Sequence, residues 1–179
     1  MSYDPQFAKI GEVLVHEGII SEKELQTALA EQKKKKDKLG NILVAKGTIT
    51  EDDLATAFSL QANCKKLTED DLLKAPEDIV KLIPEDFARQ NNILALKKTS
   101  DSIYVAIEDP EDVSTLDAIK KLVKLKPEVF VSGKTAIKNA IDQLYERVKK
   151  SGEVQSAISN IKIVKGNEEG GDELDLGSE

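Results

Sequence analysis

Residues Ser132 to Thr135 read Ser-Gly-Lys-Thr, which is how a phosphate-binding P-loop ends. The stretch stands between an expected strand and an expected helix, the place where such a loop occurs. A complete loop also needs a glycine five positions before Gly133, so that successive backbone N–H groups wrap the phosphates, and position 128 is Glu. Because a carboxylate there would repel a phosphate, we interpret the stretch as an ordinary strand-to-helix turn.

The residues suited to nucleophilic or metal chemistry are few. His16 is the only histidine and Cys64 the only cysteine. No serine or cysteine stands in a recognisable triad context with His16, and one cysteine makes neither an internal disulfide nor a cysteine-based metal site. The acidic residues are dispersed over expected helix surfaces, where solvated charge is their ordinary role. We therefore expect no catalytic residue, no metal site and no enzyme activity.

A tandem repeat is the most informative feature of the chain. KIGEVLVHEGIISEKELQTALAEQ, from Lys9 to Gln32, aligns without a gap with KLGNILVAKGTITEDDLATAFSLQ, from Lys38 to Gln61, and 11 of the 24 positions are identical. A solenoid needs about three or more stacked units, whereas this pattern stops after two. Two copies instead predict a pseudo-twofold unit, each half of which makes the same contacts to one half of a twofold partner.

Each copy predicts two short helices. Apolar residues at helical spacing end at Gly18 and Gly47, which suit C-terminal caps. Ser21 with Glu24 and Thr50 with Asp53 have the spacing of capping boxes that open a second helix. We expect a four-helix subdomain over residues 1–66.

The rest of the chain predicts a small sheet and then a tail, so the fold class is α+β. Helical patterns at PEDIVKLI and PEDFARQN precede a hairpin of two strands over 92–98 and 102–108, a helix over 114–124, a strand over 128–131 and a final helix over 135–149. We expect these to form an α/β subdomain over 67–149 with about three strands. Residues 150–179 are rich in glycine and acid, and we expect a disordered acidic linker or tail.

Composition limits the compartment and the class of partner. The chain is 40% hydrophobic and 33% charged, and no apolar run approaches the roughly 20 residues that span a bilayer. The N-terminus lacks the basic and apolar regions of a signal peptide, so we expect a cytoplasmic protein without a transmembrane segment. Most of the net charge of -7 falls in the tail. The nearly neutral remainder neither forbids nor favours a small anionic ligand, and we expect no DNA or RNA partner.

The repeat resembles the paired 24-residue motifs of the MshEN-type domain at the N-terminus of type II secretion and type IV pilus assembly ATPases. The resemblance covers both motifs and the spacer at 33–37. It continues through IVKLIPEDFARQNNILAL, YVAIEDP and the closing IDQLY. That family binds cyclic di-GMP, a twofold dinucleotide with two phosphates and two purine faces. The resemblance therefore implies one half-site in each motif for one half of this ligand.

The resemblance also implies which residues contact the ligand. The first motif position carries the charge, the glycines let backbone N–H groups approach, the aliphatic positions contact the bases, and the glutamines hydrogen-bond the polar rim. Lys9 and Lys38 stand where the family usually has arginine, which keeps the charge but loses the planar stacking surface. The implied site comprises Lys9, Ile10, Gly11, Leu14, Leu25, Leu29 and Gln32 in the first motif and Lys38, Leu39, Gly40, Leu43, Leu54, Phe58 and Gln61 in the second.

Three further interpretations stay open at this stage. Caps and core alone explain about half of the repeat identities, in a helical hairpin that binds no nucleotide. A regulatory module would bind cyclic di-GMP and act on a secretion or pilus motor ATPase in cis or in trans. A docking domain would connect that ATPase to its inner-membrane platform protein without any nucleotide, and either role allows recruitment to the inner membrane by partners.

Overall fold

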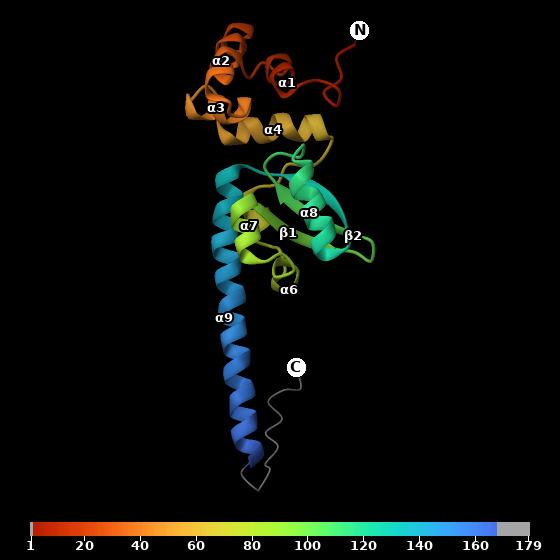
Figure 1. Ribbon diagram of the computed structural model, residues 1–179, viewed down its shortest axis with the longest axis vertical. Helices are drawn as coiled ribbons and strands as arrows, with labels where there is room; N and C mark the ends of the chain where they lie inside the picture. The colour runs from red at the N-terminus through yellow and green to blue at the C-terminus, as the bar shows by residue number, and fades with distance from the viewer. Residues whose placement is uncertain (1, 168–179) are drawn as a thin grey trace.

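The computed structural model describes residues 2–167, and the surroundings of side chains up to residue 153. Four helices come first, and Figure 1 shows them together at one end of the molecule above a sheet subdomain. The elements in chain order are α1 (Ile10–His16), α2 (Glu22–Lys35), α3 (Leu39–Ala45), α4 (Glu51–Ala62), α5 (Glu69–Leu72), α6 (Glu77–Val80), α7 (Glu85–Asn91), β1 (Ile93–Lys98), β2 (Ser102–Ile107), α8 (Val113–Val123), β3 (Lys126–Val131) and α9 (Lys134–Asn167). The α+β class expected from the sequence is confirmed.

The turns inside each motif form as the cap residues predict. The Ser21 hydroxyl accepts a hydrogen bond from the backbone N–H of Glu24, and the Glu24 carboxylate accepts one from the N–H of Ser21. Thr50 and Asp53 repeat this pair of bonds at the start of α4. Gly18 and Gly47 have φ of 72° and 74°, a backbone region that glycine adopts without steric cost. Both motifs therefore turn from one helix to the next in the same way.

The two motifs complete each other rather than folding side by side. The contacts of α1 are mainly with α4, and those of α2 mainly with α3, so each helix packs chiefly on the other motif. One hydrophobic core draws on both copies, with Leu14 and Leu43 fully buried at equivalent positions. A single copy exposes the apolar face that the other copy covers, so the pair is the smallest unit with a closed core.

A three-stranded mixed sheet forms the second subdomain. Its order is β1-β2-β3, with β1 antiparallel to β2 and β2 parallel to β3. Helices α6, α7 and α9 pack on β1, and α8 packs beside β3. The residues Ile93, Leu94 and Ala95 of β1 are fully buried. The sheet is therefore covered by helices, and its core is separate from that of the four N-terminal helices.

Two features differ from the sequence-based expectations. The short helix α5 was not expected, and its Thr68 N-cap forms a capping box with Asp71. The last helix was expected to end near residue 149 and a disordered tail to begin at 150, but α9 continues to Asn167 and extends beyond the sheet subdomain (Figure 1). No proline interrupts this stretch, and a glycine such as Gly152 costs a helix only about 1 kcal/mol. The remainder of the expected tail, residues 168–179, lies outside the described residues.

Tyr145 connects α9 to the last residue of α6 and to the turn that follows it, and its substitution tests the second core. The buried hydroxyl lies 2.6 Å from the carbonyl oxygen of Ile83 and 3.1 Å from that of Val80. We expect Tyr145→Phe to lower the free energy of unfolding at pH 7 by about 1 to 2 kcal/mol, because buried carbonyl oxygens lose their donor. Urea denaturation followed by circular dichroism measures this.

The same residue gives a pH dependence with a definite sign. Burial raises the pKa of Tyr145 to about 12. A raised pKa favours the neutral phenol in the folded state, so its stabilisation is complete below pH 10 and is lost as the pH rises towards 12. The wild-type protein should lose stability over that interval more steeply than Tyr145→Phe. The half-exposed Tyr104 provides the control, since Tyr104→Phe should follow the wild type. Parallel curves for wild type and Tyr145→Phe would contradict the assignment.

Candidate ligand-binding site

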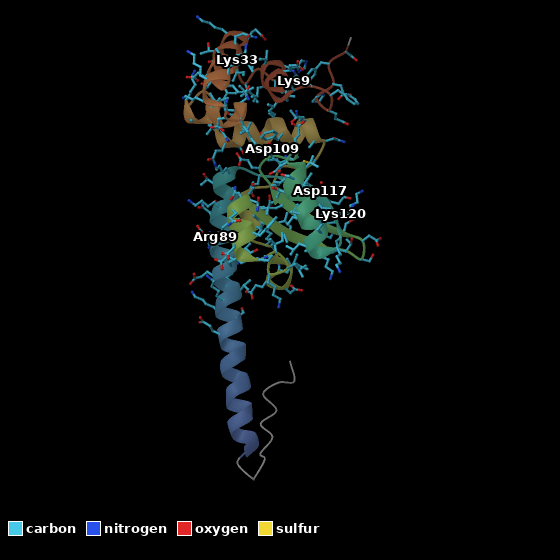
Figure 2. All side chains as sticks on the ribbon, viewed as in Figure 1. Lys9, Lys33, Arg89, Asp109, Asp117 and Lys120 are labelled. Atoms are coloured by element: carbon cyan, nitrogen blue, oxygen red, sulfur yellow. The ribbon has the colours of Figure 1, made fainter. Side chains whose placement is uncertain are left out.

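The lysine that opens each motif is the N-cap of a short helix. Lys9 precedes α1 and Lys38 precedes α3, both with extended backbone. Both side chains are exposed, so their charges are available at the surface. Figure 2 labels Lys9 at α1 and Lys33 at the neighbouring α2. The repeat therefore places two cations at equivalent positions, each at the start of a helix.

A cavity of about 770 Å³ lies between α1 and α2 of the first motif. The two helices supply residues at helical spacing, so that one face of each lines the space. Leu25 is buried and Leu29 is partly exposed, which makes this wall apolar. Of the residues implied by the resemblance, the lining includes Lys9, Ile10, Gly11, Leu25, Leu29, Gln32 and Leu39.

A smaller cavity of about 320 Å³ lies at the second motif. Part of its lining is equivalent to that of the first cavity: Lys38, Leu39, Gly40, Asn41, Leu54 and Phe58 correspond to Lys9, Ile10, Gly11, Glu12, Leu25 and Leu29. The implied residues that line it are Lys38, Leu39, Gly40, Leu54 and Phe58, together with Ile10 and Gln32 from the first motif. Ile10, Gln32 and Leu39 thus line both cavities, so the two spaces meet at the seam between the motifs.

The structure does not bring every implied residue to a cavity. Leu14 and Leu43 are 0% and 1% exposed and belong to the shared core. Neither lines the two cavities. Their recurrence in the repeat is explained by packing, and the same holds for the valines and isoleucines around them.

The two glutamines close the pseudo-twofold unit by linking each motif to the other. The Gln32 side-chain amide donates to the carbonyl oxygen of Asp37 at 3.1 Å, directly before Lys38. The Gln61 amide donates to the carbonyl oxygen of Ala8 at 3.0 Å, directly before Lys9. Each glutamine at the end of one motif therefore fixes the chain at the start of the other. Gln32 also faces both cavities, whereas Gln61 is 7% exposed and lines neither.

The motif glycines lie in the first turns of α1 and α3, and close packing explains both. A Cβ on Gly11 would lie 2.6 Å from Cδ1 of Leu25, and one on Gly40 would lie 2.8 Å from Cδ2 of Leu54. These distances are shorter than real contacts, so only a residue without Cβ lets each leucine stay where it is. The glycines therefore set the position of the leucines that line the cavities.

Several lining residues were not among the implied ones. The first cavity also has Tyr3, Glu12, Val15, His16, Glu22 and Gln26 in its lining, and the second has Asn41, Glu108, Asp109 and Glu111. Tyr3 precedes the repeat and Glu108 to Glu111 follow it by many residues, so no repeat position points to them. Asp109, which comes two residues after β2, lies at the second cavity although no position of the repeat points to it.

A salt bridge joins the second motif to the sheet subdomain at this cavity. Lys38 Nζ lies 3.2 Å from Oδ2 of Asp109, the residue that Figure 2 labels between α4 and the sheet subdomain. Partial burial works to lower the pKa of Lys38, but the hydrogen bond from its ammonium group to Asp109 and the nearby Asp112 and Glu108 raise the pKa overall. Burial raises the pKa of Glu108 beside it. The second cavity therefore has a more acidic rim than the first.

The Ser-Gly-Lys-Thr stretch is a strand-to-helix turn between β3 and α9, as expected. The N–H and hydroxyl of Thr135 donate to the two carboxylate oxygens of Glu51, both at 2.9 Å. The Ser132 hydroxyl donates to the carbonyl oxygen of Leu67 at 2.8 Å. The N–H that a phosphate-binding loop would offer to a phosphate is thus bound by a carboxylate of α4, and the turn serves the contact between subdomains.

Substitution of each glutamine by alanine tests whether Gln61 contributes more to stability than Gln32 does. We expect Gln61→Ala to lower the free energy of unfolding by about 1 to 2 kcal/mol, because the Ala8 carbonyl oxygen loses a donor in a partly buried position. Gln32→Ala should cost less than about 1 kcal/mol, because water reaches the exposed carbonyl oxygen of Asp37. Chemical denaturation of both variants measures the difference, and equal losses would contradict it.

Comparison with known proteins gives matches to one family and its relatives. The MshEN domain model matches residues 66–151, which include the sheet subdomain and follow the tandem motifs. The type IV pilus assembly ATPase PilB of Myxococcus xanthus (strain DK1622) is 30% identical over 168 residues, which are 93% of this chain. The chain spans 30% of the length of that relative.

Solved structures show the same fold. A structure of MshE with cdg, which denotes cyclic di-GMP, matches with a TM-score of 0.69 and 27% identity over 77% of this chain and 99% of that one. The N-terminal domain of XpsE matches with a TM-score of 0.64 and 17% identity, over 79% and 96% of the two chains, which shows the fold alone. Residues 66–151 therefore form an MshEN domain, and the chain is similar to the N-terminal domains of type II secretion and type IV pilus assembly ATPases.

Proposed function

We propose that this chain is a regulatory module that binds cyclic di-GMP through its two motifs. The observation that carries the proposal is the pair of cavities at equivalent repeat positions, which meet along Ile10, Gln32 and Leu39. A twofold dinucleotide has two identical halves joined in one ring. A molecule of this kind can make the same contacts in both cavities at once, whereas an asymmetric ligand of the same size would meet equivalent residues with unlike groups.

The chemistry of the linings suits the parts of that ligand. Leu25, Leu29 and Leu54 offer apolar surface to the faces of the purines, and Phe58 adds an aromatic ring. The exposed ammonium groups of Lys9 and Lys38 suit the two phosphates, as point charges without the planar fork of arginine. At the second cavity, the carboxylates of Glu108 and Asp109 suit the N–H donors on the edge of a guanine. MshE, a relative with this fold, has been solved with the same ligand.

The ligand would act on an ATPase through the contact between subdomains. Asp109 belongs to the sheet subdomain and pairs with Lys38 of the second motif, so a phosphate that competes for Lys38 would loosen this contact. The chain would thereby couple ligand occupancy to a type II secretion or type IV pilus assembly ATPase, in cis or in trans. Among the described residues, no helix is both long and apolar enough to cross a bilayer.

Titration calorimetry with matched charge variants tests the proposal. Wild-type protein should bind cyclic di-GMP at one molecule per chain. Lys9→Gln should weaken binding by about tenfold, because loss of one charge-assisted contact costs on the order of 1.5 kcal/mol. Lys33→Gln removes the same charge from the exposed end of α2, which is outside both cavities, and should bind as the wild type does.

A second pair of variants tests the apolar wall. Leu29→Glu places a carboxylate in the first cavity and should reduce binding at least as strongly as Lys9→Gln, whereas Ala30→Glu adds the same charge to an exposed position outside both linings. Guanosine monophosphate fills only one half-site and should bind far more weakly than the cyclic dinucleotide. No heat from wild-type protein at high micromolar cyclic di-GMP would overturn the proposal.

A docking role without nucleotide is the second candidate. Its support is the long α9, whose backbone extends past the sheet subdomain (Figure 1). Complex formation with the cytoplasmic domain of an inner-membrane platform protein, measured with and without cyclic di-GMP, distinguishes the roles. Affinity that is independent of the ligand, together with no heat in the titration, would favour docking.

A further inference from the structure

The two cavities differ most at their outer ends. At the second motif the outer wall comes from the sheet subdomain, through Glu108, Asp109 and Glu111. At the first motif the outer wall comes from Tyr3 and His16, with no contribution from the sheet subdomain to the lining. Each motif is thus completed by a segment from outside the repeat, and the segment that completes the first motif is the stretch before α1.

Tyr3 is held in this wall by a stacked pair of rings. The ring centroids of Tyr3 and His16 are 3.5 Å apart, with 13° between the planes. His16 is the last residue of α1, and its counterpart at the end of α3 is Ala45, which has no ring to stack on. His16, the only histidine in the chain, therefore positions Tyr3 against the first cavity.

The Tyr3 hydroxyl is an unused donor at this cavity. Its oxygen is buried and has no hydrogen-bond partner within residues 2–167. A buried hydroxyl without a partner is unfavourable, and native structures seldom keep one unless an additional group completes it. The side chain lines the first cavity, so a small rotation of the ring would bring the hydroxyl to an acceptor of a ligand in that space.

The aromatic residues of the two half-sites also indicate that Tyr3 contacts the ligand. Lysine replaces the arginine of the family in both motifs, and with it the planar surface that stacks on a base is lost. In the second motif Phe58 stands where the first has Leu29 and restores an aromatic ring to the cavity. The first motif keeps Leu29 at that position, and the ring of its own that lines the cavity is the imidazole of His16. Tyr3 stacks on this imidazole and brings a second, larger ring to the lining.

We propose that Tyr3, positioned by His16, is the base-contacting residue of the first half-site and makes the two half-sites unequal. Its ring stacks on one guanine of the dinucleotide, and its hydroxyl donates to an acceptor atom of the ligand. This inference rests on the proposed function and adds to it a contact residue from outside the motifs. Stacking of a base on an aromatic side chain is strong enough to govern the affinity of a half-site.

Calorimetric titration of the full chain with cyclic di-GMP tests this residue. Tyr3→Ala should weaken binding on the order of tenfold through the loss of stacking. Tyr3→Phe keeps the ring and should weaken binding by about two- to fivefold through the loss of one neutral hydrogen bond. His16→Ala should fall between wild type and Tyr3→Ala, because the ring remains but loses its support. Tyr104→Phe, in β2 and outside both linings, should bind as the wild type does.

A direct contact measurement accompanies the affinities. Nuclear Overhauser effects between the ring protons of Tyr3 and the guanine H8 proton are expected in the complex. Thermal melting of each variant shows whether the fold is retained. Wild-type affinity for Tyr3→Ala, or complete absence of these Overhauser effects, would overturn the inference while the proposed function stands. Absence of binding by the wild type would overturn both.

Discussion

The mutual completion of the two motifs is the constraint on which the rest of the structure depends. Helix α1 packs chiefly on α4 and α2 chiefly on α3, so neither copy has a closed core alone. Gln32 and Gln61 stabilise this arrangement. Each donates a hydrogen bond to the backbone carbonyl oxygen of the residue that precedes the first lysine of the other motif. The cavities meet at the seam between the motifs, where Ile10, Gln32 and Leu39 line both spaces.

The same constraint explains why so many repeat identities persist without touching a ligand. Leu14 and Leu43 form the shared core, and Gly11 and Gly40 make room for Leu25 and Leu54. The ligand contacts are therefore the outward-facing members of a pattern whose inward-facing members build the fold. The two motifs differ where segments from outside the repeat contact them. Asp109 and Thr135 from the sheet subdomain meet the second motif, and Tyr3 meets the first.

Local chemistry made much of the fold predictable from the sequence. The capping pairs at Ser21 and Thr50 and the positive φ at Gly18 and Gly47 depend only on neighbouring residues, and all four are confirmed. The hairpin of β1 and β2 followed from two β-type runs joined by the short stretch from Thr99 to Asp101. The predicted end of α9 was wrong. Glycine and charged residues were interpreted as the start of a disordered tail, but the helix continues through them and contains no proline.

The site was less predictable, because its geometry depends on residues distant in the sequence. The repeat indicated which positions are paired, but it did not distinguish a lining leucine such as Leu29 from a core leucine such as Leu14. The buried, structural position of Gln61 was also not visible in the pattern. Asp109 follows the second motif by many residues, and its salt bridge to Lys38 exists only once the sheet subdomain is packed against the N-terminal helices, as β3 is against α4.

Methyl-resolved nuclear magnetic resonance during a titration with cyclic di-GMP tests the central claim most directly. The claim is that one twofold ligand occupies both cavities. The account predicts that methyl resonances of Leu25 and Leu29 from the first motif and of Leu54 from the second shift together and saturate at one ligand per chain. Shifts confined to one motif, two separate saturation points, or no shift in either motif would contradict it.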